Sequence, residues 1–180
     1  GDRRVAWLTV DSIWHLVDAE TGELLSGWQM VDNSLYYLKP ASFDEEGYLL
    51  TGSFEMETGN QKNKSGWAQI DGKWYSIQSW GGARTGWFNY DGNKYYLHED
   101  GHMEENVLNL DGTLYFFQSW GGVRVNDVVE YEGNYYYVGV DGAVSATPGW
   151  KKIKIDKETI WYWTTEDGGK LLTNSWLDYN

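Results

Sequence analysis

The sequence contains no cysteine among its 180 residues and only 2 prolines. Without disulfides, the fold must be held by packing, and stacking of repeats onto one another is one route to stability. The absence of cysteine leaves the cellular compartment open. No run of 18 apolar residues occurs, which excludes a transmembrane helix. The apolar h-region of an export signal does not follow residues 1–4, so any such signal is expected to have been removed or to lie outside this sequence.

Basic residues are also few. The 14 Lys and Arg stand against 27 Asp and Glu, which gives a formal net charge of −13. Nucleic acids and anionic membranes attract clustered Lys and Arg, so neither is expected as a partner. A bare polyphosphate polymer is disfavoured for the same reason. Neutral sugars and cationic ligands are compatible with this charge.

Residues for nucleophilic or metal chemistry are scarce. There is no cysteine and no Gly-x-Ser-x-Gly elbow, and most carboxylates occupy expected turn positions. His98 and His102 are four residues apart, but in an expected turn rather than a helix, so we interpret them as part of a polar connector. We therefore expect a protein that is not an enzyme and that uses no metal and no cofactor.

Aromatic residues and glycine are abundant, with 12 Trp, 14 Tyr and 22 Gly. Disordered chains are poor in aromatics, so disorder is not expected. Aromatic side chains suit the pleated surface of strands and glycine suits tight turns. The composition therefore favours an all-β fold with many turns.

An internal repeat of about 20 residues runs along the chain. Residues 65–77 read Ser-Gly-Trp-Ala-Gln-Ile-Asp-Gly-Lys-Trp-Tyr-Ser-Ile. Asp-Gly between two short aromatic runs predicts a β-hairpin with a type I′ turn. The same frame recurs with these pairs of residues: Trp7 and Trp14, Trp28 and Tyr36, Trp87 and Tyr95, Val107 and Tyr115, Val128 and Tyr136, Trp150 and Trp161.

The repeats predict one all-β solenoid of stacked two-stranded β-hairpins over residues 1–180, because a single hairpin is only marginally stable in water. Residues of about 39–65 lack a second aromatic strand, so an irregular or incomplete repeat is expected there. Residues 149–180 carry a longer turn and are expected to form an atypical terminal repeat.

Pairing across the two-residue turn assigns each side chain to a face. In the unit of residues 65–77, Trp67 and Trp74 share one face, and Tyr75 lies on the other. A tyrosine recurs at the position of Tyr75 in other units, and we interpret this regular ladder as core. Its other members are Tyr36, Tyr95, Tyr115, Tyr136 and Tyr162.

The motifs Thr-Gly-Trp, Asp-Gly, Lys-Trp-Tyr and Asp-Gly-x-Met resemble the cell-wall-binding or choline-binding repeats of Gram-positive bacteria. Related repeats occur in the glucan-binding regions of glucosyltransferases and in large clostridial toxins. The resemblance covers nearly the whole chain. It implies a secreted module that is associated with the cell surface and binds choline, glucans or host glycans.

In choline-binding members of this family, rings from neighbouring hairpins form a cage around the ammonium group, which cation–π attraction explains. The resemblance implies such a cage from Trp67 and Trp74, which Tyr96 could close. The two tryptophans of the first unit, Trp7 and Trp14, also fit the pattern. Trp150 with Trp161 fits if the longer turn permits. The other units depart from it; Lys94, for example, would repel a cation.

Two connectors replace the ordinary Asp-Gly with Trp-Gly-Gly, at Trp80 and at Trp120. Each is preceded by a Gln and followed by an Arg, such as Gln78 and Arg84. The indole could offer its flat face to a pyranose ring while Gln and Arg bind hydroxyls. The alternative is that both tryptophans cap the neighbouring hairpin's aromatic layer, with the arginines stacked on them.

These observations leave three hypotheses for function. The first is a non-catalytic module that binds a cell-wall polymer or glycan by aromatic stacking between hairpins. The second is a choline-specific anchor to teichoic acids, and the third is a structural spacer or protein-interaction rod without a small ligand. Trp67, Trp74, Trp80 and Trp87 come from consecutive complete units, so ligand binding is predicted to concentrate around residues 65–96 rather than 107–137.

Overall fold

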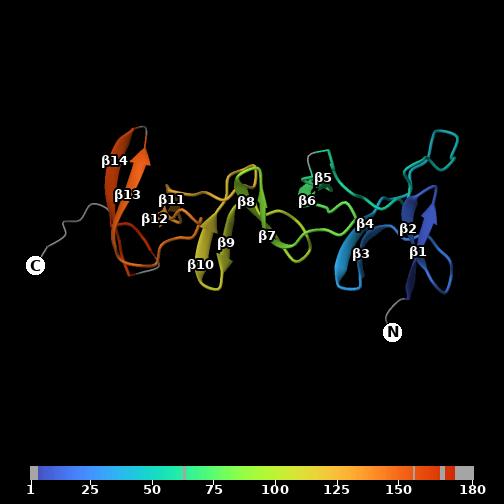
Figure 1. Ribbon diagram of the computed structural model, residues 1–180, viewed down its shortest axis with the longest axis horizontal. Helices are drawn as coiled ribbons and strands as arrows, with labels where there is room; N and C mark the ends of the chain where they lie inside the picture. The colour runs from blue at the N-terminus through green and yellow to red at the C-terminus, as the bar shows by residue number, and fades with distance from the viewer. Residues whose placement is uncertain (1–3, 63, 156, 167–168, 173–180) are drawn as a thin grey trace, which may run out of the picture. The chain divides into compact units, whose positions relative to one another are not determined.

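The computed structural model describes residues 4–62, 64–155, 157–166 and 169–172. Across these ranges the protein is all-β, with fourteen strands in seven antiparallel two-stranded sheets and no helix (Figure 1). The predicted all-β fold of two-stranded hairpins is confirmed. The strands are β1 (Val5–Val10), β2 (Ile13–Asp18), β3 (Gly27–Val31), β4 (Ser34–Leu38), β5 (Trp67–Ile70), β6 (Lys73–Ser76), β7 (Gly86–Tyr90), β8 (Asn93–Leu97), β9 (Val107–Leu110), β10 (Thr113–Phe116), β11 (Asp127–Tyr131), β12 (Asn134–Val138), β13 (Gly149–Ile155) and β14 (Glu158–Thr164).

Consecutive strands form the hairpins, which we number 1 (β1–β2) to 7 (β13–β14); connector n is the segment that follows hairpin n. The turn of hairpin 3 has positive φ at both central residues, 49° at Asp71 and 79° at Gly72, as a type I′ turn requires. Its register pairs Gln69 with Trp74 and Ala68 with Tyr75, as the sequence predicts. Positive φ at both central positions recurs at Asp11-Ser12, Asp32-Asn33, Asp91-Gly92, Asp111-Gly112 and Glu132-Gly133.

An apolar residue at the end of the second strand anchors most hairpins. Leu38, Ile77, Leu97 and Val138 are completely buried. Each connector then folds back on this residue through a single antiparallel bridge, for example between Ile77 and Ala83. Hairpin and connector together therefore form the repeating unit.

Connectors 2 to 7 also dock on the hairpin one repeat earlier, connector 3 on hairpin 2 for example, through a backbone hydrogen bond. The donated N–H groups reach the carbonyl oxygens at 2.6–2.9 Å. Because the bond uses only the backbone, it tolerates different side chains from unit to unit. The donor and acceptor pairs are Met56 to Trp14, Ala83 to Leu35, Met103 to Trp74, Val123 to Lys94, Val144 to Leu114 and Leu171 to Tyr135.

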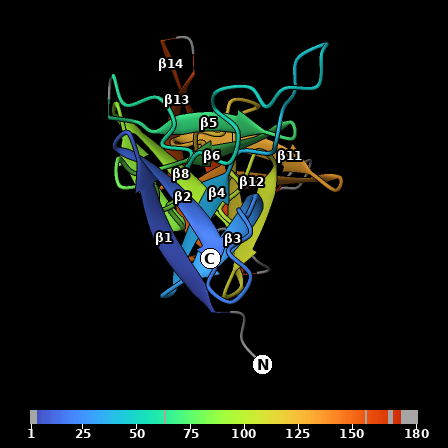
Figure 2. The same ribbon diagram turned by 90° about the vertical axis from the view of Figure 1, so that its right-hand side faces the viewer.

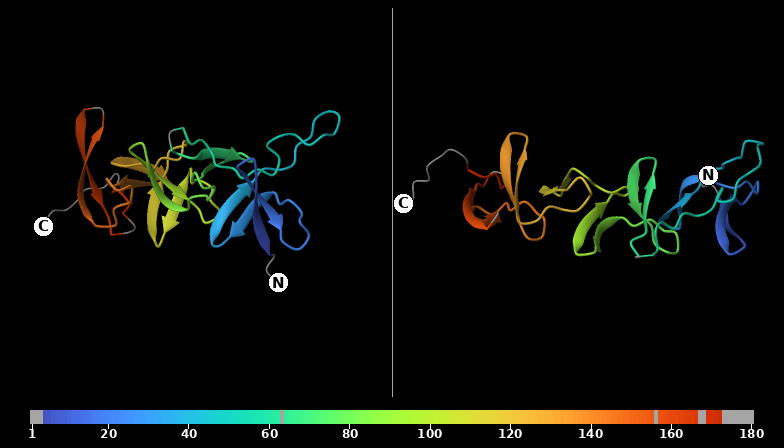
Figure 3. Two further views of the ribbon diagram at one scale, coloured as in Figure 1. Left: turned by 45° about the vertical axis from the view of Figure 1, so that its right-hand side comes forward. Right: turned by 90° about the horizontal axis from the view of Figure 1, so that it is seen from above.

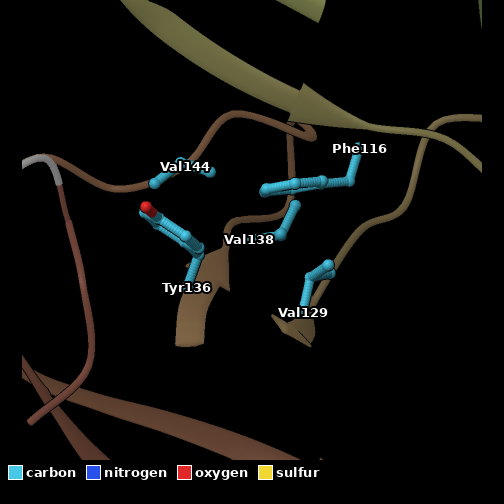
Figure 4. Close-up of a cluster of buried hydrophobic side chains, with 5 residues drawn as sticks. All are labelled: Phe116, Val129, Tyr136, Val138 and Val144. Atoms are coloured by element: carbon cyan, nitrogen blue, oxygen red, sulfur yellow. The ribbon is translucent and has the colours of Figure 1, made fainter. Parts of the chain in front are cut away.

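The contacts divide the chain into two compact units: unit 1 holds residues 1–90 and 97–103, and unit 2 holds residues 91–96 and 104–180. Each unit has its own apolar core. In unit 1, one cluster contains Leu16, Leu25 and Leu38 and another contains Ile70, Tyr75 and Ile77. In unit 2, the cluster consists of Phe116, Val129, Tyr136, Val138 and Val144 (Figure 4).

The segment between β4 and β5 contains no strand among its described residues. It is a long loop of unit 1, with single bridges from Phe43 to Leu49 and from Leu38 to Met56 (Figures 2 and 3). The buried Ser53 closes its base through hydrogen bonds between its hydroxyl group and Ser42. Despite its irregular course, the loop delivers Met56 to the carbonyl oxygen of Trp14, so the docking bond of the regular connectors is retained.

Candidate functional site

Three tryptophans and a tyrosine meet in unit 1 and line a cleft of about 170 Å³. The ring of Trp7 lies 6.1 Å from that of Trp14 and 4.8 Å from that of Tyr36, measured between centroids, both edge-on. Trp80 completes the ring of aromatics, 5.8 Å from Tyr36. Met56 is the fifth lining residue. We call this group the aromatic cage.

The cage combines three consecutive repeats. Trp7 and Trp14 come from hairpin 1, Tyr36 from hairpin 2 and Trp80 from connector 3. The tight turn of connector 3 fixes Trp80, because the N–H of Gln78 donates to the carbonyl oxygen of Gly82 at 2.9 Å. A Cβ atom at Gly82 would lie 1.9 Å from the indole of Trp80, so the absence of a side chain there makes room for the ring.

The cage suits a soft cation without hydrogen-bond donors. Its two outer tryptophans keep an open face, since Trp14 is 46% and Trp80 49% exposed. Among the residues that the structure describes, no carboxylate and no side-chain amide lines the cleft. Ring faces attract a cation through their quadrupole, whereas a primary ammonium would find few acceptors for its N–H groups. The arrangement therefore favours a quaternary ammonium group.

The same frame gives no cage one repeat later in unit 1. Trp28 still packs on the next tyrosine, Tyr75, at 4.6 Å. However, Leu35 occupies the docking position of Trp14, and Asp100 occupies the connector position of Trp80. Burial of Asp100 raises the pKa of its carboxyl, but hydrogen bonds from His102 more than offset this, so the pKa is lowered overall. The carboxylate of Asp100 is therefore hydrogen-bonded to His102 of the same connector.

Unit 2 repeats parts of the pattern. Trp120 lies edge-on to Tyr95 at 6.0 Å, as Trp80 does to Tyr36, and is similarly exposed. Around Tyr115, a side chain of the protein itself lies at the position that corresponds to the cage. There the ammonium group of Lys94 lies 5.8 Å from the tyrosine ring centroid and donates to the backbone carbonyl of Asp141 at 3.2 Å.

The structure thus brings together Trp7, Trp14 and Trp80 among the predicted site residues. Trp87 lines a separate groove that also borders Trp80. Trp67 packs edge-on against Phe88 at 5.8 Å, and Trp74 is 38% exposed. The remaining predicted residues lie in unit 2: Tyr96, which is half-buried, and Trp120.

Two cage residues were not predicted as site residues. The sequence places Tyr36 in the tyrosine core ladder, of whose members only Tyr75, Tyr95 and Tyr136 are buried. Met56 lies in the irregular segment between β4 and β5 and belongs to none of the recurring motifs. The alternative interpretation of Trp80 as a cap holds in part, since it does contact Tyr36. Arg84, however, lies over Phe88 at 4.6 Å.

At the C-terminal end of unit 2, Trp150 and Trp161 line a shallow cleft on hairpin 7, and both are about half exposed. Within the described residues, no group of three or more His, Asp or Glu side chains could hold a metal ion. The described part of the chain also contains no helix long and apolar enough to cross a membrane.

Comparison with known families identifies two repeats of this chain. Residues 65–81 and 85–103 match the model of the cell wall binding repeat. These segments run from hairpin 3 into connector 3 and from hairpin 4 into connector 4. The resemblance to cell-wall-binding repeats is thereby confirmed. No curated protein matches the sequence of the chain.

Solved structures share the fold. Choline binding protein F from Streptococcus pneumoniae superposes with a TM-score of 0.61 at 24% identity, over 96% of this chain and 53% of that one. The same protein in the presence of a peptidoglycan analogue, a tetrasaccharide-pentapeptide, gives 0.61 at 23% identity, over 97% and 54%. Its complex with ipratropium gives 0.55 at 22% identity, over 96% and 49%. The present chain spans about half the length of these proteins.

Proposed function

We propose that this protein, whose hairpins include cell wall binding repeats, is a non-catalytic attachment module of a secreted protein that is held at the bacterial surface. The aromatic cage of Trp7, Trp14, Tyr36 and Trp80 would hold a choline-like quaternary ammonium group of a wall polymer. The single observation behind this proposal is the convergence of these rings on one cleft, whose lining contains no charged group within the described part of the chain.

The charge of the chain supports a substituent rather than the polymer backbone as the recognised group. With a net charge of −13, the chain repels a bare polyphosphate. A cation carried by the polymer reverses this repulsion locally. Attachment should therefore depend on the presence of choline on the wall, and excess free choline should elute the protein from walls that carry it.

The acidic residues support binding rather than catalysis. In the regular hairpins they occupy turn positions with positive φ, such as Asp71, Asp91 and Asp111. These three residues are exposed, and acidic residues are common in tight turns for conformational reasons. Choline binding protein F, which shares the fold, is itself named for choline binding.

Titration of the chain with choline tests the proposal. Choline should change tryptophan fluorescence, while its uncharged isostere 3,3-dimethylbutanol should bind about 5- to 30-fold more weakly, since a cation–π contact contributes about 1–2 kcal/mol. The primary amine ethanolamine keeps the charge but should also bind more weakly, because the cleft offers few acceptors for its N–H groups. Trp14→Ala should reduce choline affinity by a similar factor. Tyr48→Ala is the matched control, because it removes an exposed aromatic outside the cage.

Equal affinity for choline and 3,3-dimethylbutanol would contradict recognition of the cation. Full retention of choline affinity by Trp14→Ala would place the ligand elsewhere on the chain.

A further inference from the structure

A second, larger recess of unit 1 is also lined by Trp80. This groove has a volume of about 610 Å³, in the range of small-molecule sites. We propose that it is a carbohydrate subsite that holds a short neutral oligosaccharide. The residues that carry the inference are Trp80, Trp87, Gln78, Arg84, Asn33 and Glu99.

Two indoles supply flat surfaces in the groove. Trp80 enters it from connector 3 and Trp87 from β7. The face of a pyranose ring that bears C–H bonds packs on the electron-rich face of an aromatic ring. Trp80 is half exposed and therefore retains area for such a contact.

Four planar polar side chains also line the groove. The amides of Gln78 and Asn33 each donate and accept hydrogen bonds, which matches sugar hydroxyls that also do both. Glu99 offers acceptors only, and Arg84 donors only. Exposed Asn33 sits at the turn of hairpin 2, where its own φ is 61°.

Arg84 is held in place but keeps donors to spare. Its guanidinium lies over the ring of Phe88, and one nitrogen donates to the hydroxyl of Ser76 at 3.1 Å. In the part of the chain that the structure describes, Arg84 forms no ion pair. Burial lowers the pKa of the Arg84 guanidinium from its usual value. A partly desolvated cation with free N–H groups is a good donor for hydroxyl oxygens.

The charges of the groove favour a neutral occupant. Arg84 and Glu99 carry opposite charges, so the lining has no net charge. A polyanion would meet one cation within a chain of net charge −13. A neutral oligosaccharide has no such repulsion to overcome.

The groove occurs where the repeat frame departs from the cage pattern. Leu35, rather than a tryptophan, lines it at the docking position, so the recess stays open. Trp80 borders both the groove and the cage. If the proposed function holds, the ammonium substituent occupies the cage while the sugars that carry it occupy the groove.

The indole N–H signals of the ¹⁵N-labelled chain, assigned with Trp→Phe variants, distinguish the two sites. The probes are choline, the β-1,4-linked tetramer of N-acetylglucosamine and isomaltotetraose. At least one tetrasaccharide should shift Trp80 and Trp87 but not Trp7 and Trp14. Choline should shift Trp7, Trp14 and Trp80. A tetrasaccharide response without a choline response would sink the cage and leave the groove standing.

Two variants test the polar contacts. Gln78→Ala and Asn33→Gly should each weaken tetrasaccharide binding at least about fivefold and leave choline affinity unchanged; glycine retains the positive φ at position 33. Gln69→Ala is the matched control, since Gln69 is exposed on β5 and lines neither recess. No shift of Trp87 by either tetrasaccharide at 20 mM overturns the proposal. So does an effect of Gln78→Ala no larger than that of Gln69→Ala.

Discussion

Trp80 lines both recesses, and its ring packs directly on the backbone of Gly82. The ring covers Gly82, whose backbone does not adopt the left-handed conformation that favours glycine. Alanine at this position would therefore cause no backbone strain. Its methyl group would overlap the ring, so the position isolates the placement of Trp80 from the stability of the turn.

Gly82→Ala should displace Trp80 and lower choline affinity by about an order of magnitude, with little change in melting temperature. The physical reason is the 1.9 Å approach of the new Cβ atom to the indole. Fluorescence titration with choline measures the effect. Gly122→Ala is the matched substitution under Trp120, in unit 2, and should leave the Trp7 indole signal responsive to choline. Unchanged choline affinity in Gly82→Ala would show that Trp80 is dispensable for the cage.

Trp80→Ala addresses whether this residue supports the fold or the ligand. Trp80 is half exposed, and the aromatic contact that it makes is one edge-on pair with Tyr36. The loss of folding free energy should therefore be about 1–2 kcal/mol, below the ~3–5 kcal/mol for a buried tryptophan. Urea unfolding gives this value. A loss in the higher range, with normal choline binding by the folded fraction, would identify Trp80 as core.

At the level of elements, the hairpins were predictable because their signals are local. The Asp-Gly pairs define type I′ turns, and each turn sets the register of the strands on either side. Hairpins 1 and 2 reach the same conformation with Ser12 and Asn33 in place of glycine, at φ values of 67° and 61°. Asparagine tolerates positive φ better than serine does.

Ser12→Gly should accordingly stabilise unit 1 by about 1 kcal/mol, because it relieves a left-handed conformation that side chains disfavour. Thermal unfolding followed by circular dichroism measures the gain. Gly72→Ala makes the reverse change in hairpin 3, where there is open space around the glycine, and should destabilise by a similar amount. A lower melting temperature for Ser12→Gly would indicate that the hydroxyl group stabilises the turn.

The composition of the site was less predictable than the hairpins. Trp7 and Trp14 could be paired from sequence, since they share one hairpin. Trp80 could not be assigned to them, because its position depends on the docking of connector 3 on hairpin 2. That docking uses the N–H of Ala83 and the carbonyl oxygen of Leu35, and backbone groups leave no trace in a sequence pattern.

The whole molecule consists of two units with separate cores. Ile77 is completely buried in unit 1, and Phe116 is 4% exposed in unit 2. The sequence repeats continue across the division without a linker rich in Pro or Ser, so no sequence feature predicts separate cores. The division reflects contacts between residues in the folded chain, which are more numerous within each unit than between the two.

Ile77→Ala and Phe116→Ala should each destabilise their own unit, by about 2–5 and 3–5 kcal/mol respectively. Amide hydrogen exchange should show faster exchange mainly within the unit that carries the substitution. Choline at 100 times its Kd should restore about 2.7 kcal/mol to unit 1 by mass action and nothing to Phe116→Ala. Loss of protection throughout the chain from either variant would indicate a single cooperative unit.

The origin of the cage in three successive repeats has a consequence for the synthesis of the protein. A ribosome releases hairpin 1 first, with Trp7 and Trp14 in place but one wall missing. Two further hairpins must emerge and fold before connector 3 can deliver Trp80. A nascent chain that ends before connector 3 therefore lacks a complete cage, and its ability to recognise an ammonium group begins only when Trp80 has reached Tyr36.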